Sequence, residues 1–302
     1  MIDSAGIESQ AMKISRRHFL TGTAGVIGAS ALVAGYAGAV EPGLRRIVTE
    51  YRLAPPGWPR DLPLKIAVIA DPHAAEPYMG AARIEEIVAA TNALLPDLVV
   101  LLGDYEANHR FVTRAVPSQL WAKLWAECRA PLGVRAILGN HDWWFHLPRV
   151  RAALDAAGIP VMENDAVRLA HRGRPFWLLG LGDQIAHIRA PGHFEGVDDL
   201  PGTLAKVTDE APIILLAHEP DIYVEVPKRI ALTLAGHTHG GQVRLFGFSP
   251  MVPSRYGNRF AYGHIVEGGR HMIVSGGLGC SIAPVRLGVP PEIVLVRLGD
   301  EA

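Results

Sequence analysis

The chain has 302 residues, of which 49% are hydrophobic and 20% are charged, a composition typical of a folded globular protein rather than a disordered one. Its 29 lysines and arginines against 30 aspartates and glutamates give a net charge of −1, which argues against a nucleic-acid partner because such proteins need a basic surface. With two cysteines, Cys128 and Cys280, neither a disulfide scaffold nor a cysteine-ligated zinc site is available, and we expect two free buried thiols.

The first forty residues have the layout of an export signal. Ser15-Arg16-Arg17-His18-Phe19-Leu20 matches the twin-arginine consensus, and an uncharged run from Thr21 to Val40 follows it. We therefore predict a twin-arginine export signal over residues 1–40, with Met12 as a second candidate start. The twin-arginine translocase would then place the protein in the periplasm or at the outer face of the cytoplasmic membrane. The segment is either cleaved after the small triplet Ala37-Gly38-Ala39 or kept as an anchor helix of about twenty residues.

Beyond this segment, strands and helices alternate along the chain. Apolar runs predict strands at 47–53, 65–70, 98–102, 134–138, 176–181, 213–217, 230–235, 271–275 and 292–297. Helical spacing of apolar residues predicts helices at 80–94, 117–128 and 148–157, the last of which is closed by Gly158. No linker or repeat divides residues 45–300, so we predict one layered α/β domain over this range.

Five of the predicted strands end in a polar cluster. The clusters are Asp71-Pro72-His73, Gly103-Asp104, Gly139-Asn140-His141, His218, and Gly236-His237-Thr238-His239. Ligands bind at the carboxyl ends of strands in open α/β sheets, so we expect these clusters to meet at one edge of a sheet.

The donors in these clusters are carboxylate, amide and imidazole groups without a thiolate. They are Asp71, His73, Asp104, Asn140, His218, His237 and His239. This set suits Mn, Fe or Zn better than Ca, and it suits two divalent ions about 3.5–4 Å apart better than a single tetrahedral ion. Each fragment alone has an ordinary structural explanation, such as a turn for Gly-Asp or a core histidine for His218. Their order, each after an apolar strand, favours the metal site.

At these residues the sequence resembles the calcineurin-like metallophosphoesterases, whose ordered signature is Asp-x-His, Gly-Asp, Gly-Asn-His, His and Gly-His-x-His. All five blocks are present, and the resemblance covers about residues 45–298. It implies a four-layer α/β/β/α sandwich with two central sheets.

The resemblance also implies a role for each matching residue. Asp71, His73 and His239 would hold one metal, Asn140, His218 and His237 the other, and Asp104 would bridge them. His141 would be the catalytic residue, facing the substrate phosphate and protonating the leaving oxygen. One position departs from the pattern, because Ala107 stands where many relatives carry an aspartate or glutamate.

The activity implied is that of a binuclear-metal-dependent hydrolase of phosphoester or pyrophosphate bonds, most simply a phosphodiesterase acting outside the cytoplasmic membrane. His218-Glu219-Pro220-Asp221 and residues 236–245 are similar to a branch of exported or membrane-associated phosphodiesterases, some of them similar to UDP-2,3-diacylglucosamine pyrophosphatase. The alternatives are a non-catalytic metal-binding module of the same fold, a phosphomonoesterase or nucleotidase, and another metallohydrolase such as an amide hydrolase.

Two apolar segments lie next to predicted ligands in the chain. They are Trp143-Trp144-Phe145, and Leu245-Phe246-Gly247-Phe248 with Met251 and Val252. At the mouth of a phosphate site they would suit a lipid-linked substrate and a peripheral membrane contact, whereas the alternative is that they pack inward as core. Arg244 and Arg255 either neutralise a second phosphate or are ordinary surface charges.

Overall fold

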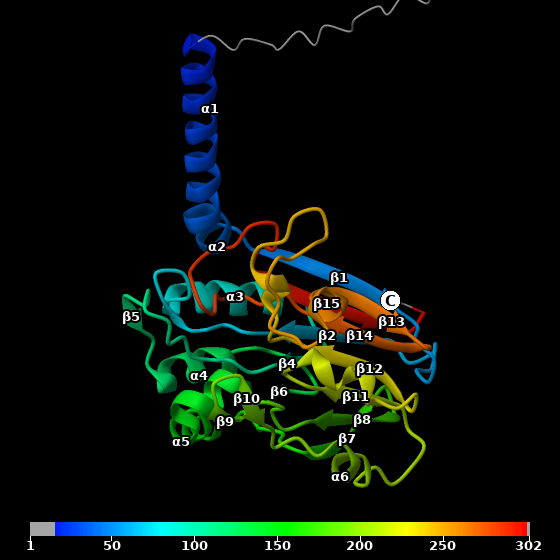
Figure 1. The fold of residues 1–302 in the computed structure, drawn as a ribbon. Helices are drawn as coiled ribbons and strands as arrows, with labels where there is room; N and C mark the ends of the chain where they lie inside the picture. The colour runs from blue at the N-terminus through cyan, green and yellow to red at the C-terminus, as the bar shows by residue number, and fades with distance from the viewer. Residues whose placement is uncertain (1–15, 301–302) are drawn as a thin grey trace, which may run out of the picture.

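Two β-sheets stack face to face in the computed structural model, which describes residues 16–300 (Figure 1). The first sheet has the order β1 (Ile47–Leu53), β15 (Glu292–Leu298), β2 (Leu64–Ile69), β4 (Leu98–Leu101) and β6 (Val134–Ala136). The second has the order β13 (Gly263–Glu267), β14 (Arg270–Val274), β12 (Ile230–Ala235), β11 (Ile213–Leu216), β8 (Arg174–Gly180) and β7 (Asp165–His171). Neighbouring strands are parallel except at the pairs β15–β2, β13–β14 and β7–β8.

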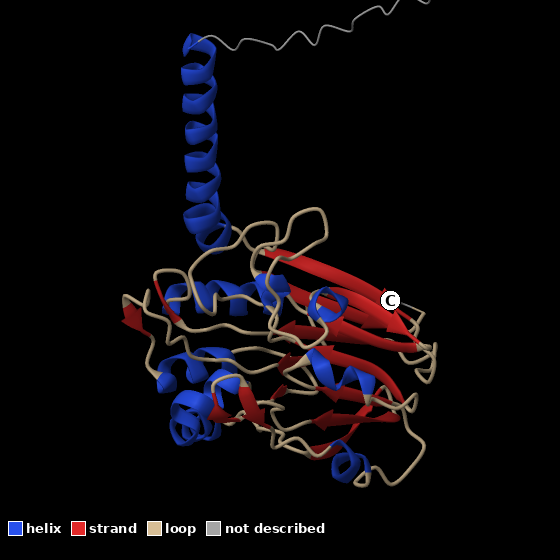
Figure 2. Cartoon of the chain, in the orientation of Figure 1, coloured by secondary structure: helices blue, strands red, loops and turns tan. Residues whose placement is uncertain are grey.

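Helices cover the outer face of each sheet (Figure 2). The first sheet packs on α3 (Ala81–Ala93), α4 (Ser118–Ala126) and α5 (Asn140–Ala156). The second packs on α6 (Leu200–Leu204) and the 3₁₀ segments η2 (Pro220–Val224) and η4 (Gly257–Phe260). A separate apolar core fills the space between the sheets. The predicted four-layer α/β/β/α sandwich is therefore confirmed.

The apolar runs form strands because both of their faces are covered. Every residue of β4, β11 and β12 is buried, as expected for central strands between a helical layer and a second sheet. All nine predicted strands are present to within about three residues at their ends. The sequence prediction missed β7 and β13, which are edge strands whose half-exposed residues do not form an apolar run.

Helix α5 begins at Asn140, so the start predicted at residue 148 was wrong. Gly139 is the extended N-cap residue, and its backbone N–H donates to the carboxylate of Asp142, the third residue of the helix, at 2.9 Å. The prediction started the helix at Pro148, where proline is favoured, but the structure accommodates this proline inside the helix. The longer helix places Asn140 and His141 in its first turn.

The N-terminal segment comprises α1 (Arg16–Gly35), the π-helical turn η1 (Tyr36–Val40) and α2 (Glu41–Leu44). Figure 1 shows α1 projecting from the sandwich. Ser15 and the residues before it lie outside the described residues, so the twin-arginine motif is described only from Arg16 onward. Between residues 16 and 300, no helix combines the length and apolar character that crossing a membrane requires.

The base of this segment packs against the sandwich. The carbonyl of Ala37 accepts a hydrogen bond from Arg286 N at 2.9 Å, and the buried Glu41 carboxylate accepts one from Val289 N at 2.8 Å. The Gly38 carbonyl accepts a further hydrogen bond from the Tyr78 hydroxyl. The small-residue triplet at 37–39 is thus held by the folded domain.

Two short strand pairs and one 3₁₀ turn complete the described chain. β3 (Ala75–Glu76) pairs with β5 (Arg114–Ala115), β9 (His187–Ala190) pairs with β10 (His193–Glu195), and η3 (His239–Gly241) follows β12. Cys128 and Cys280 are both free and buried.

Candidate metal centre

The five polar clusters meet at one edge of the two sheets. They follow the carboxyl ends of β2, β4, β6, β11 and β12, which the sandwich places side by side. All seven side chains named from the sequence as ligands come together there, in two groups that the following distances define.

The first group comprises Asp71, His73 and His239, all of them buried. The Nε2 atoms of His73 and His239 are 3.1 Å apart, and Nε2 of His239 lies 3.7 Å from Oδ1 of Asp71. Burial lowers the pKa of His73 to about 3, so this ring is neutral. Two ring nitrogens and a carboxylate oxygen this close together are suited to hold a cation between them.

The second group comprises Asn140, His218 and His237. Oδ1 of Asn140 lies 3.2 Å from Nε2 of His218 and 2.9 Å from Nδ1 of His237. One amide oxygen and two ring nitrogens therefore converge on one point, and the three donors suit a transition metal or zinc.

Asp104 lies between the two groups. Its Oδ2 atom is 3.5 Å from Nε2 of His73 and 3.3 Å from Nε2 of His218. Its Oδ1 atom accepts a hydrogen bond from the backbone N–H of His141 at 2.8 Å. Because one carboxylate oxygen faces a histidine of each group, Asp104 has the position that a bridging ligand requires.

The tautomers of two histidines also fit metal binding. Nδ1 of His73 lies 3.2 Å from the carbonyl of Glu106, and Nδ1 of His218 lies 2.6 Å from the carbonyl of Leu102. A carbonyl only accepts hydrogen bonds, so each Nδ1 carries the proton. When each ring is neutral, the lone pair of its Nε2 therefore faces the centre, as in most metal-binding histidines.

The protonation states of the buried acidic and histidine side chains favour the binding of cations. Burial raises the pKa of Asp71 to about 7. Burial would also raise the pKa of Asp104, but His218 and His141 outweigh it and hold that pKa well below the usual range. The same Asp104 carboxylate raises the pKa of His218, against the effect of burial. A divalent ion between these groups would replace the proton on His218 and neutralise Asp71 as a carboxylate.

The backbone at the site is strained. Five of the proposed ligands adopt left-handed φ angles, which residues with a side chain rarely adopt. They are Asp71 (49°), His73 (43°), Asp104 (57°), His237 (67°) and His239 (51°). Each such residue costs on the order of 1–3 kcal/mol, and strain of this kind concentrates at functional sites. These turns direct the five side chains toward the ligand cluster.

Gly139 allows the close approach of the second group. A Cβ atom at this position would lie 2.4 Å from Oδ1 of Asp104 and 2.6 Å from Cε1 of His218. We expect Gly139→Ala to weaken metal binding by about 10–100-fold, as loss of ligand support does elsewhere. Metal content after dialysis against graded metal concentrations measures this. Gly28→Ala, where a Cβ meets nothing within 4 Å, is the control, and equal metal affinity of both variants would contradict the expectation.

A cleft of about 550 Å³ opens beside His237. Trp144 and Phe194 form one wall, with ring centroids 5.6 Å apart and planes inclined at 17°, and the Trp144 indole N–H donates to the Ile185 carbonyl at 2.9 Å. Glu219 and the exposed Arg255 also line it. The cleft thus offers an aromatic wall and charged groups next to the second ligand group.

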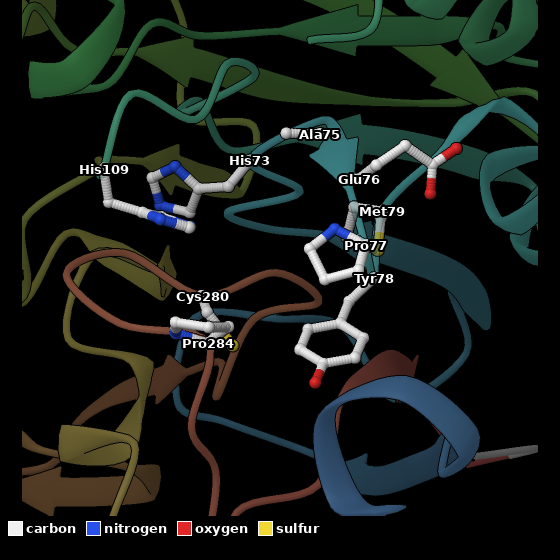
Figure 3. A pocket seen from close by; sticks show the side chains of 9 residues that line it. All are labelled: His73, Ala75, Glu76, Pro77, Tyr78, Met79, His109, Cys280 and Pro284. Carbon is white, nitrogen blue, oxygen red and sulfur yellow. The ribbon is translucent and has the colours of Figure 1, made fainter. Parts of the chain in front are cut away.

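A much smaller hollow, of about 20 Å³, lies on the other side of the centre. Figure 3 shows His73 and His109 at one side of it, Cys280 and Pro284 below them, and Tyr78 opposite. Its volume is enough for about one water molecule and too small for a substrate.

The two apolar segments noted in the sequence differ in how far their side chains are buried. Trp143 packs against the core beneath the first sheet, whereas Trp144 lines the cleft and Phe145 is exposed. Leu245, Phe246, Phe248 and Met251 are exposed, and Val252 is half-buried.

The two arginines named from the sequence also differ. Arg244 donates to Ser249 Oγ at 3.1 Å and lies over the Tyr262 ring, so it holds its own loop. Arg255 is exposed and lines the cleft.

Comparison with known proteins places the chain among enzymes. Residues 64–241 match the family model described as calcineurin-like phosphoesterase. The chain belongs to the calcineurin-like metallophosphoesterase family. It is 33% identical over 295 residues to the phosphodiesterase YaeI of Escherichia coli (strain K12), covering 94% of this chain and 99% of that protein. It is 31% identical over 296 residues to YkuE of Bacillus subtilis (strain 168), described as an uncharacterized metallophosphoesterase, covering 95% and 98%.

Among solved structures, this metallophosphoesterase is similar to the calcineurin-like phosphoesterase YfkN from Bacillus subtilis. The TM-score is 0.45 at 15% identity, covering 72% of this chain and 82% of that chain. From its family and relatives, the protein is a metal-dependent phosphoester hydrolase.

Sequence reasoning missed several residues that support the centre. The buried Asp142 carboxylate accepts from the backbone N–H groups of Asp104 and Tyr105 at 2.8 and 2.9 Å, which fixes the turn that carries Asp104. The fully buried Arg286 donates to the carbonyls of Gly279 and Val289 and lies 3.2 Å from Nδ1 of His239. Asp142 follows His141 directly and could have been found as a helix cap, whereas no local pattern identifies Arg286.

Proposed function

We propose that this metallophosphoesterase is a phosphodiesterase that uses two divalent ions, each of them Mn, Fe or Zn. Asp71, His73 and His239 would hold one ion, Asn140, His218 and His237 the other, and Asp104 would bridge them. The observation that carries the proposal is the position of Asp104, whose Oδ2 lies within 3.5 Å of a histidine Nε2 from each group.

The ions and the protein side chains would have different roles in phosphodiester hydrolysis. When bound, the ions lower the pKa of a coordinated water and neutralise the charge on the phosphate oxygens. Asp104 would hold them at a fixed separation, and Asp142 would keep Asp104 in place through its backbone. His141 contributes its side chain beside the first group, with its ring centroid 4.8 Å from that of His73. In this position His141 would donate a proton to the oxygen that leaves phosphorus.

Two observations support a diester rather than a monoester substrate. A phosphodiester carries a second esterified group, and the cleft of about 550 Å³ beside His237 provides room for it. The relative YaeI is described as a phosphodiesterase.

An activity screen tests the proposal. We expect hydrolysis of bis(4-nitrophenyl) phosphate with added Mn, slower hydrolysis of 4-nitrophenyl phosphate, and none of a 4-nitroanilide. Chelation should abolish the activity and Mn should restore it, because no other group in the site generates hydroxide at neutral pH. Protein that binds two ions and cleaves no phosphoester would instead be a non-catalytic module, and cleavage of the anilide would indicate an amide hydrolase.

We propose further that the protein is exported by the twin-arginine route and acts at the outer face of the cytoplasmic membrane with its N-terminal segment attached. The twin-arginine motif supports export. The packing of Ala37 and Gly38 on the sandwich supports retention, because cleavage after Ala39 would remove their hydrogen bonds with Arg286 and Tyr78. The intact mass of the exported protein tests this, since a chain beginning near Val40 would contradict retention.

A lipid-linked substrate is part of the same proposal. Phe246, Phe248 and Met251 are exposed on one loop, and Phe246 is fully exposed. This loop is joined to the base of α1 through residues 286–287, because Leu287 accepts from Arg244 N at 2.8 Å and Arg286 N donates to Ala37. Apolar side chains gathered beside a projecting helix suit a lipid surface.

Vesicle sedimentation measures the predicted contact. We expect binding of the full chain to vesicles of phosphatidylethanolamine and phosphatidylglycerol. The variant with Phe246→Ser and Phe248→Ser should lose at least about 10²-fold in binding, because each of the two buried aromatics contributes about 1.5–3 kcal/mol. Ile188→Ser, at an exposed position of β9, is the control. Equal binding by both variants would contradict a role for the loop.

A further inference from the structure

The imidazole ring of His141 is held at both of its nitrogens. Nδ1 lies 3.1 Å from Oδ1 of Asn108, and Nε2 lies 3.2 Å from Oγ of Ser281. Asn108 lies between β4 and β5, and Ser281 lies between β14 and β15. Two loops that are distant in the sequence therefore meet on one side chain.

The chemistry of these partners determines where the ring carries its proton. An amide oxygen only accepts hydrogen bonds, so Nδ1 of His141 donates to Asn108. A neutral imidazole has one N–H, and its lone pair is then on Nε2, where the Ser281 hydroxyl donates. When the ring takes up a second proton, that proton is on Nε2, so Nε2 is the atom that exchanges protons with the cleft.

Asn108 supplies the oxygen that faces Nδ1 of His141, and the residue before it is Ala107, whose side chain carries no polar group. Asn108 carries no charge, so it orients the ring without adding a counterion beside the ligand cluster.

The partner at Nε2 is held in place by its own loop. The Ser281 backbone N–H donates to Oε1 of Gln242 at 2.7 Å, and Nε2 of Gln242 donates to the carbonyls of Ala283 and Val285 at 2.9 Å each. Ser281 Oγ thus occupies a fixed point at hydrogen-bond distance from the proton-exchanging atom. An oxygen that leaves phosphorus must reach the same point to receive the proton.

We propose that Asn108 is a positioning residue that fixes the tautomer and orientation of His141, and that Ser281 Oγ occupies the place of the leaving oxygen until substrate binds. In the reaction, the P–O bond to the attacking water oxygen forms and the P–O bond to the alcohol breaks. The Nε2 proton of His141 passes to the alcohol oxygen. The proton released by the attacking water leaves to solvent, and the ring is reprotonated from solvent. This inference rests on the proposed phosphodiesterase function.

The test compares two leaving groups in otherwise identical substrates, methyl 4-nitrophenyl phosphate and methyl phenyl phosphate. 4-Nitrophenolate leaves readily without a proton, whereas phenolate depends more on one. We expect Asn108→Leu to lower kcat for the phenyl ester by about 10²-fold and for the nitrophenyl ester by less than about tenfold, with KM and metal content unchanged. Asn108→Asp keeps an acceptor and should restore kcat to within about threefold of wild type.

A control and an independent readout make the test decisive. Asn92→Leu removes an asparagine whose side chain bonds the backbone of Glu127 and Arg129, and it should leave both rates unchanged. Nitrogen-15 NMR of the zinc-loaded protein, with His141 assigned by comparison with His141→Gln, should show Nδ1–H in the wild type and Asn108→Asp and a tautomer mixture in Asn108→Leu.

Three results would overturn the inference. They are equal rate losses for the two esters, an Asn108→Asp variant as impaired as Asn108→Leu, and a His141 tautomer that does not change in Asn108→Leu. A metal-loaded wild type that cleaves neither ester would refute the proposed function instead, and the NMR measurement would still decide the role of Asn108.

Discussion

The Asp104→Asn protein is expected to hydrolyse phosphodiesters at least about 10³-fold more slowly than the wild type and to lose at least one bound ion. Oδ1 of Asp104 accepts from the His141 backbone N–H, so an asparagine oxygen would keep that position. Its NH₂ group would then replace Oδ2, which faces His73 and His218. An amide NH₂ repels a cation and cannot bridge two. The residue is nearly isosteric, so the fold should be retained.

Metal analysis and steady-state kinetics on the same preparation measure this result. Asp165→Asn is the matched control, because Asp165 lies on β7 away from the centre and forms an exposed ion pair with Lys206. A variant at position 104 that keeps two ions and turns over within about tenfold of the wild type would disprove the bridging role.

The second large effect is expected for His141→Ala, which should retain both ions and lose about 10²–10⁴-fold in kcat. The His141 side chain contacts Asn108 and Ser281, whereas its backbone N–H supports Asp104. Alanine keeps the backbone contact and removes the ring. Metal binding and catalysis should therefore separate in this variant, which they cannot do in Asp104→Asn.

The comparison variant is His264→Ala, because His264 lies on β13 next to His271, away from the ligands. Its metal content and kcat should match those of the wild type. Release of the ions from His141→Ala would show that His141 is a ligand. Unchanged kcat would show that another group protonates the leaving oxygen.

The sequence by itself determined the buried strands of the fold and which side chains gather at the centre. Buried strands such as β4 and β12 are continuous apolar runs whose length and order can be read directly. Parallel strands end at one edge of a sheet, so Asp71, Asp104 and His237 had to lie near one another once their strands were recognised. The apolar run in the sequence and the position of the strand in the fold have the same cause, because a strand buried between two layers must be apolar on both faces.

Only the tertiary structure decided the start of α5, the edge strands and the surroundings of the ligands. The capping of α5 depends on the Asp142 side chain turning back to Gly139, which a later proline obscured in the sequence. Asn108, Ser281 and Arg286 act through single contacts with histidines that are distant in the chain. Such contacts leave no periodic pattern, because a loop residue is selected for one neighbour in space rather than for a repeating buried face.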